Sequence, residues 1–305
     1  MDFTVYAASD GDHRANPCAC KICGSETISI GGKWGKYRPE VFCLRRCPQC
    51  HFAFVANPWT DYAAIYSEDY YAGKGADPLV DYRFELDFPE GTIRLYEWRG
   101  LVSLIKSLIP VRASTAWLDF GCGNGGLVRY CHEQNICQAL GFEDGAIREE
   151  AAKRGIPLLD KSEIERRGGA FEVVTAIEVL EHVEDPLKTL RQIRYLLKPG
   201  GLLFFTTGNA APYRANLLDW RYVIPEIHIS FYEPETLRQA LLRTGFQPEF
   251  RGYLPGFTDI IRFKILKNLR VRRCAVWQDL LPWPLLASAA DARYGITRHP
   301  IAWAA

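Results

Sequence analysis

No stretch of this 305-residue sequence reaches the roughly 18 uncharged apolar residues that a membrane-spanning helix needs. The first residues also lack a charged segment followed by an apolar one, so no secretory leader is expected. Glycine (25) and proline (18) are too sparse and too aperiodic for a collagen-like or disordered chain, while 48% hydrophobic residues can form a core. We therefore expect a cytoplasmic globular protein with roughly two domains.

The sequence also lacks an excess of either charge, since 37 Lys and Arg face 36 Asp and Glu. This balance disfavours a protein that coats a polyanion, and thus a nucleic-acid partner. The charges are nevertheless unevenly placed: residues 61–250 are net acidic, whereas residues 251–305 carry nine basic and three acidic side chains.

Six of the ten cysteines lie between positions 18 and 50, and four of them form two CxxC pairs. Without a leader, this clustering favours metal over disulfides. A two-residue spacer lets one turn present both thiolates to a zinc ion, which prefers four tetrahedral ligands. We predict a structural zinc ribbon within residues 1–57, with the remaining thiols of Cys18 and Cys43 either replacing a ligand or buried. The predicted ligands are Cys20, Cys23, Cys47 and Cys50.

Residues 58–110 are expected to form a helical, aromatic joining region. Apolar residues recur there at helical spacing until Pro110. Tyr66, Tyr70 and Tyr71 precede a Gly-Lys-Gly segment at 73–75, so they could form a lid over a site or simply pack in a core.

Residues 111–250 alternate short apolar runs with helical patterns, which predicts a doubly wound, mostly parallel α/β sheet. A turn is expected at 198–201. Residues 251–305 are expected to form a basic helical insertion followed by a last strand at 299–305. The expected strands before it are 115–120, 139–143, 156–159, 171–177 and 202–207, and the expected helices are 127–135, 145–155 and 186–197.

A glycine-rich loop from Asp119 to Gly125 follows the first of these strands. Glycines let the backbone approach a ligand closely, and the next helix offers free N–H groups. Glu143 ends the neighbouring strand, where a carboxylate can accept both hydroxyls of a ribose. The loop lacks the GxGxxG spacing of a dinucleotide site, and the charge of Asp119 disfavours a pyrophosphate. The pattern indicates a nucleoside carrying an ammonium group.

At this point the sequence resembles the class I S-adenosylmethionine-dependent methyltransferases. The similar segments are LDFGCGNG, Glu143, FEVVTAIEVLEHVEDP and LKPGG, in the family's order. The segments CKICGS, RCPQCHFAFVANP and YSEDYY look like the zinc-ribbon subgroup, and HISFYEPETLRQALLRTGF resembles its penultimate helix. The resemblance runs from about Cys20 to Phe246. It implies a Rossmann-like seven-stranded sheet with an antiparallel last strand.

The resemblance also implies roles for individual residues. Asp119 would hold the amino group of the cofactor, Glu143 the ribose and Asp160 the adenine. Asp144 departs from the small or apolar residue expected after Glu143, and it could instead cap the next helix. The full set of expected cofactor-binding residues is Asp119, Gly121, Cys122, Gly123, Gly125, Glu143, Asp144, Asp160, Glu178 and Tyr71.

The segment from Glu178 to His182 leaves a strand and begins to coil, so Glu178, Glu181 and His182 can lie on one side. Together with His228 they could hold a second divalent cation. Alternatively, His182 or His228 acts as a metal-free base, or the residues serve only as scaffold. The expected catalytic residues are His182, His228 and Glu181.

An aromatic segment after the fifth strand is where the family builds its acceptor pocket. The expected lining residues are Tyr213, Trp220, Tyr222 and Tyr232. The resemblance implies methyl transfer to a small or medium-sized metabolite, with O-methylation favoured. RNA methylation that uses the ribbon, sugar C-methylation and a silent scaffold are the alternatives. A basic amphipathic helix at 260–273 could make weak contact with a membrane surface, or be a solvated helix face. The sequence leaves the oligomeric state open.

Overall fold

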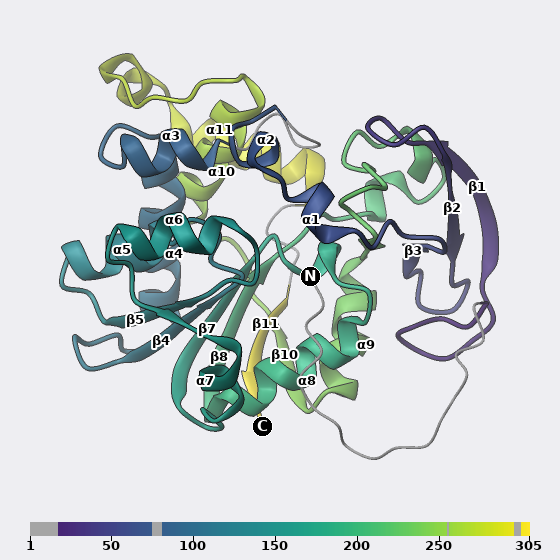
Figure 1. Ribbon diagram of the computed structural model, residues 1–305, viewed down its shortest axis with the longest axis horizontal. Coiled ribbons are helices and arrows are strands. Elements are labelled where there is room, and N and C mark those ends of the chain that lie inside the picture. The colour runs from purple at the N-terminus through teal and green to yellow at the C-terminus, as the bar shows by residue number, and fades with distance from the viewer. Residues whose placement is uncertain (1–17, 75–80, 255, 296–299) are drawn as a thin grey trace. The chain divides into compact units, whose positions relative to one another are not determined.

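The computed structural model describes residues 18–74, 81–254, 256–295 and 300–305, and its elements are labelled in Figure 1. The chain divides into two compact units. The first contains the described residues of Met1–Ile65, Lys161–Glu249 and His299–Ala305, and the second those of Tyr66–Asp160 and Phe250–Arg298. The cysteine-rich segment and both candidate catalytic histidines therefore belong to one unit, whereas the glycine-rich loop belongs to the other.

A small antiparallel sheet in the first unit contains the ribbon (Figure 1). Its first three strands follow one another in the sequence: β1 (Ile28–Trp34), β2 (Val41–Arg46) and β3 (Ala53–Val55). The fourth strand, β9 (Ser230–Phe231), comes from the distant segment after the fifth strand of the α/β pattern and pairs with β3. The ribbon thus shares its sheet with residues next to His228.

The second sheet has seven strands, which confirms the predicted Rossmann-like class. The pairs β4·β5, β5·β6 and β7·β8 are parallel, whereas β11 is antiparallel to β8. The middle of β7 is buried, as the long apolar run of a covered parallel strand predicts. In sheet order the strands are β10 (Phe246–Phe250), β11 (Pro300–Ala304), β8 (Leu197–Thr206), β7 (Phe171–Ile177), β4 (Ala116–Phe120), β5 (Gln138–Phe142) and β6 (Leu158–Leu159).

The expected turn at 198–201 is instead an irregularity inside β8. Gly200 has φ 73°, and the pairing of β7 with β8 shifts register across this segment. The helices and helical turns between the strands lie at α5 (Gly126–Glu133), α6 (Ile147–Lys153), α7 (Lys161–Glu165), η1 (Leu180–His182), α8 (Pro186–Leu196), η2 (Ala211–Tyr213), η3 (Leu217–Asp219) and α9 (Pro234–Arg243).

The joining region and the C-terminal insertion are helical. In the second unit α4 (Arg94–Leu108) and α10 (Phe257–Asn268) pack closely. The approach is so close that a side chain at Gly100 would meet the Gly256 carbonyl oxygen at 2.6 Å. The elements are α1 (Tyr62–Ile65), α2 (Glu68–Tyr71), α3 (Tyr82–Asp87), α4 (Arg94–Leu108), α10 (Phe257–Asn268), η4 (Val276–Leu280) and α11 (Trp283–Tyr294). Gly75 and His299 lie outside the described residues.

The basic helix predicted at 260–273 is not a simple amphipathic surface helix. Ile261, Phe263 and Leu266 of α10 are buried, whereas Leu269, directly after the helix, is 67% exposed. Arg262 is only 5% exposed, and its guanidinium lies 3.6 Å from the Tyr96 ring and pairs with Asp279 at 2.7 Å. Among the described residues, no helix combines the length and apolar character needed to cross a bilayer.

Candidate functional site

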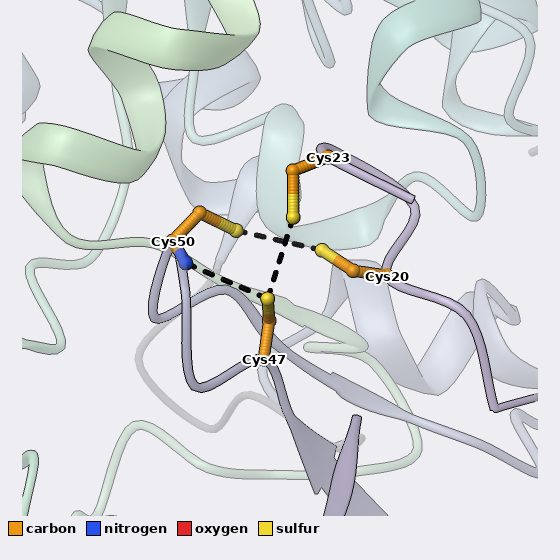
Figure 2. Close-up of side chains that lie close together, drawn as sticks. All are labelled: Cys20, Cys23, Cys47 and Cys50. Atoms are coloured by element: carbon orange, nitrogen blue, oxygen red, sulfur yellow. Dashed lines mark hydrogen bonds between the residues drawn. The ribbon is translucent and has the colours of Figure 1, made fainter. Parts of the chain in front are cut away.

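The two CxxC turns bring four thiols together, as the spacing predicts. Figure 2 shows the four side chains converging from two loops. The sulfur of Cys20 lies 3.4 Å from that of Cys50, and Cys23 lies 3.4 Å from Cys47. All four sulfurs lie within 4.8 Å of one another. Four clustered thiols could hold a metal ion, and Cys20, Cys47 and Cys50 are buried.

Two backbone N–H groups donate to sulfurs of the cluster. The N–H of Ile22 donates to the Cys20 sulfur at 3.4 Å, and that of Cys50 to the Cys47 sulfur at 3.5 Å. The hydrogen bond from the Cys50 thiol lowers the pKa of Cys20 to about 5, whereas the same bond raises the pKa of Cys50 and burial raises that of Cys47. The two other nearby thiols stand apart: Cys18 is half-buried, Cys43 is exposed, and neither belongs to the cluster.

The glycine-rich loop after β4 has the backbone that its sequence predicts. Gly121, Gly123 and Gly125 have φ values of 75°, 56° and 73°, a region that side chains disfavour. The backbone N–H groups of Gly121 and Cys122 both donate to the Phe142 carbonyl, at 2.8 and 3.0 Å. This pairing holds the loop against the end of β5.

Glu143 lies directly after β5 and is 2% exposed. Its carboxylate accepts the backbone N–H of Gly123 at 2.8 Å and of Gly145 at 2.7 Å. Burial raises the pKa of Glu143. A carboxylate has about four acceptor positions, so two such bonds leave capacity for a ligand's hydroxyls. Asp119, 5% exposed, is the penultimate residue of the neighbouring strand β4.

Tyr71 reaches the same place from α2. It is 4% exposed, and its hydroxyl makes no hydrogen bond within the described residues. A side chain at Gly145 would collide with that hydroxyl and with Glu143, so a glycine is required there. The rings of Tyr66 and Tyr70 instead pack edge to face at 5.0 Å and are buried. Two of the three tyrosines expected as lid or core therefore pack as core residues.

Two other expected cofactor contacts lie at strand ends. Asp160 follows β6 and is half-buried. Asp144 is exposed. The alternative in which Asp144 caps α6 is wrong, because α6 begins after Ala146 and no side chain caps it.

The sequence analysis missed a polar group behind the glycine loop. Asn124 donates to Glu85 at 2.8 Å, and its carbonyl oxygen accepts the Gly126 N–H at the start of α5. Glu85 in turn pairs with Arg94 at 3.1 Å. The Tyr82 ring lies against Gly123 and stacks on Tyr71 with centroids 5.9 Å apart. Asn is a favoured helix cap, which was the only signal in the sequence for this group.

The acidic and histidine cluster forms where β7 ends. Glu178 adopts φ 53°, and the chain then coils into η1. Glu181, His182 and His228 offer ligand atoms within 4.8 Å of one another, as predicted. The hydroxyl of Tyr222 donates to Glu178 at 3.2 Å and also to Glu181.

Backbone carbonyls fix both imidazole rings of this cluster. The Nδ1 of His182 lies 2.8 Å from the Ile227 carbonyl oxygen, and the Nδ1 of His228 lies 2.6 Å from that of Tyr222. A carbonyl can only accept, so each Nδ1 carries the hydrogen of its bond. Glu181 is fully buried, and its Oε2 makes no hydrogen bond within the described residues. Burial, followed by the charge of Glu178, raises the pKa of Glu181 to about 8.

Aromatic rings form a continuous column that ends at the two histidines. Centroid separations along it are 4.8 Å from Tyr213 to Trp220, 4.7 Å to Tyr222, 4.1 Å to His228 and 4.9 Å to His182. Tyr213, Trp220 and Tyr222 also pack against the hydrophobic core under the ribbon sheet.

The expected pocket residue Tyr232 has a different environment. It is 1% exposed, its hydroxyl donates to the Leu180 carbonyl at 2.8 Å, and its ring packs on Phe52 at 5.3 Å. Tyr232 therefore supports η1 from the core and presents no surface to a ligand, contrary to the expectation.

A family model described as a methyltransferase domain matches residues 93–249. This span includes the glycine loop, Glu143, the Glu178–His182 segment and His228.

Individual relatives are similar over part of the chain. The ubiquinone biosynthesis O-methyltransferase of Albidiferax ferrireducens is 37% identical over 119 residues, which are 35% of this chain and 46% of that protein. The protein of the same name from Ralstonia nicotianae is 35% identical over 171 residues, 48% of this chain and 69% of its own length. The chain thus spans less than half of the first of these relatives. Human N-acetylserotonin methyltransferase in complex with S-adenosylmethionine aligns with 17% identity and a TM-score of 0.41, covering 50% of this chain and 48% of that one.

Proposed function

The chain belongs to the methyltransferase family, as a class I S-adenosylmethionine-dependent enzyme, and we propose that it methylates a hydroxyl oxygen of a small or medium-sized acceptor. The observation that carries the proposal is the cluster of Glu181, His182 and His228, because a hydroxyl acceptor must lose a proton and this cluster can promote that loss. The name shared by relatives at 35–37% identity supports an oxygen acceptor.

The second unit fits the cofactor. Glu143 has acceptor capacity for the ribose hydroxyls, and the charge of Asp119 suits the ammonium group. The glycine at position 145 lets the backbone pass close to Glu143 and to the buried Tyr71 hydroxyl. S-adenosylmethionine, when bound, supplies a methyl group on a good leaving group. The chain then has to bind the acceptor, orient it toward the methyl group and exclude water.

The first unit holds the groups that act on the acceptor. Glu181, His182 and His228, with Glu178 beside them, form the donor set of a divalent cation. Metal-bound histidines commonly donate their other ring N–H to a backbone carbonyl, as both do here. The cation would lower the pKa of the acceptor hydroxyl. Without a cation, Nε2 of His228 would take the proton itself.

The four clustered thiols are proposed to bind one structural zinc ion. All four ligand positions come from the protein, which leaves none for a substrate. The exposed Cys43 and half-buried Cys18 take no part.

The test is transfer of a labelled methyl group to matched acceptors. The purified protein would be incubated with methyl-labelled S-adenosylmethionine and pairs of phenols, catechols or sugars and their amino analogues. Label is expected in the hydroxyl member of a pair, and calorimetry should show S-adenosylhomocysteine binding with a Kd on the order of micromolar. Label only in amines, carbon or RNA would contradict O-methylation, and preferential binding of NAD would contradict the cofactor assignment.

A further inference from the structure

The tripeptide 226–228 combines two contacts with one of the candidate catalytic histidines. Glu226 is 1% exposed, and its Oε1 accepts the backbone N–H of Tyr37, in the hairpin between β1 and β2, at 2.8 Å. The carbonyl of Ile227 binds Nδ1 of His182. The third residue is His228 itself. One short segment therefore connects the ribbon hairpin to both histidines.

The residues that follow are also tied to the ribbon. The backbone N–H of Val55 donates to the Ile229 carbonyl at 2.9 Å, and β3 pairs with β9 through Phe54 and Ser230. On the other side, the Ile229 N–H donates to the Glu181 carbonyl at 2.8 Å. The segment 229–231 thus lies between a ribbon strand and the turn that carries Glu181.

A metal ion bound to the four thiols would influence residues 229–231 through β3. Cys47 and Cys50 flank the turn that leads into β3, so a metal ion bound by the four thiols would hold that turn in place. A shift of about 1 Å at a reacting group can cost on the order of 100-fold in rate.

From these contacts we propose that the ribbon positions the catalytic histidines, and that Glu226 is a positioning residue for His182 and His228. The proposal rests on the proposed function for what the histidines do, but the contacts that hold them do not depend on it. The ribbon is then part of the acceptor site's framework and not a separate binding module.

The test compares Glu226→Ala with Glu226→Gln, because the amide oxygen of glutamine can still accept from Tyr37. The chief readout is the Nδ1–H signal of His228, hydrogen-bonded to Tyr222, in a proton–nitrogen NMR spectrum. We expect Glu226→Ala to shift or broaden this signal and to lower kcat by about 10-fold or more, with zinc content and S-adenosylhomocysteine affinity unchanged. Glu226→Gln should keep the His228 signal and kcat of the wild type.

Thr244→Val is the matched control. The Thr244 hydroxyl is also buried and donates to a backbone carbonyl, that of Ala240 at 2.9 Å, but this bond lies at the end of α9 and involves neither the ribbon nor residues 226–231. The His228 signal should stay in place in this variant. If Glu226→Ala does not fold, Glu226→Asp, whose shorter side chain cannot reach Tyr37, has the same expected effects.

An unchanged His228 signal and unchanged kcat in Glu226→Ala would overturn the proposal, as would a Thr244→Val variant that moves the signal equally. Because the NMR signal is measured without an acceptor, a wild-type protein that methylates no hydroxyl would refute only the proposed function.

Discussion

The Nδ1 of His228 lies 2.6 Å from the carbonyl oxygen of Tyr222, whose ring stacks on the same imidazole with centroids 4.1 Å apart. One tyrosine therefore fixes both the tautomer and the plane of the histidine. The Tyr222 hydroxyl also donates to Glu181, so the orientation of the carboxylate is coupled to that of the imidazole. The positions of His228 and Glu181 in the cluster are therefore set by the same tyrosine.

Changing His228 to alanine should abolish turnover without weakening cofactor binding. Its removal eliminates either a cation ligand or a general base, and general acid–base groups contribute roughly 10²- to 10⁴-fold. We expect a kcat loss of that size by radiometric assay, with S-adenosylhomocysteine affinity unchanged by calorimetry. The control is His132→Ala, which removes an exposed histidine on α5. Normal turnover in His228→Ala would mean that His228 has only a structural role.

Chelation separates the two roles left open for His228. If the cluster binds a cation, mild EDTA treatment that leaves the ribbon zinc in place should stop turnover, and Mg²⁺ or Mn²⁺ should restore it. Turnover that is insensitive to EDTA would favour the metal-free base.

Changing Glu143 to alanine should remove cofactor binding. Each hydrogen bond to a charged group contributes about 1.5–3 kcal/mol, so losing two ribose contacts predicts a Kd for S-adenosylhomocysteine at least about 100-fold higher. The variant also frees the N–H groups of Gly123 and Gly145. Glu149→Ala, which removes an exposed carboxylate on α6, is the matched control. Calorimetric affinity within a few-fold of wild type would contradict the assignment.

Short-range patterns in the sequence were sufficient for much of this fold. The CxxC spacing predicted the four-thiol cluster, and the glycine loop predicted positive φ at Gly121 and Gly123. These features depend on residues close in sequence, where spacing nearly determines geometry. The sequence also predicted that His228 would join Glu181, because both side chains are typical ligands of a divalent cation.

Long-range partners could not be predicted in the same way. Nothing in the sequence near Asn124 indicates that its side-chain amide would donate a hydrogen bond to Glu85. Nor does the sequence indicate that β9 would join the ribbon sheet. Tyr232 shares the aromatic character of Trp220 but is a core residue, because its hydroxyl finds the Leu180 carbonyl. Composition shows that an aromatic is present, whereas tertiary packing decides which atoms it faces.

Replacing Cys47 with serine should remove one metal ion per chain. A hydroxyl is a poor zinc ligand beside three thiolates, and structural zinc sites contribute directly to folding. We expect the zinc content measured by elemental analysis to fall from about one ion per chain to near zero, and the midpoint of thermal unfolding to be lower. Cys43→Ser, on the exposed side of β2, should keep both values. A purified native protein that contains no zinc would contradict the proposed zinc site.

Replacing Arg262 with alanine should destabilise the second unit, although the sequence places this residue in a basic helix. Its guanidinium is buried over Tyr96 and lies 5.0 Å from the Trp283 ring, so the substitution removes a desolvated cation–π contact, a hydrogen bond to the Tyr96 hydroxyl and the packing of a long side chain. Its ionic partner Asp279 is largely exposed, so little penalty comes from an unpaired carboxylate. We expect a loss of about 2–3 kcal/mol in the free energy of unfolding by urea titration. The control is Lys264→Ala on the same helix: Lys264 is only half-buried, so its loss should cost less than about 0.5 kcal/mol. Equal effects of the two substitutions would mean that α10 is the solvated basic helix that its sequence suggests.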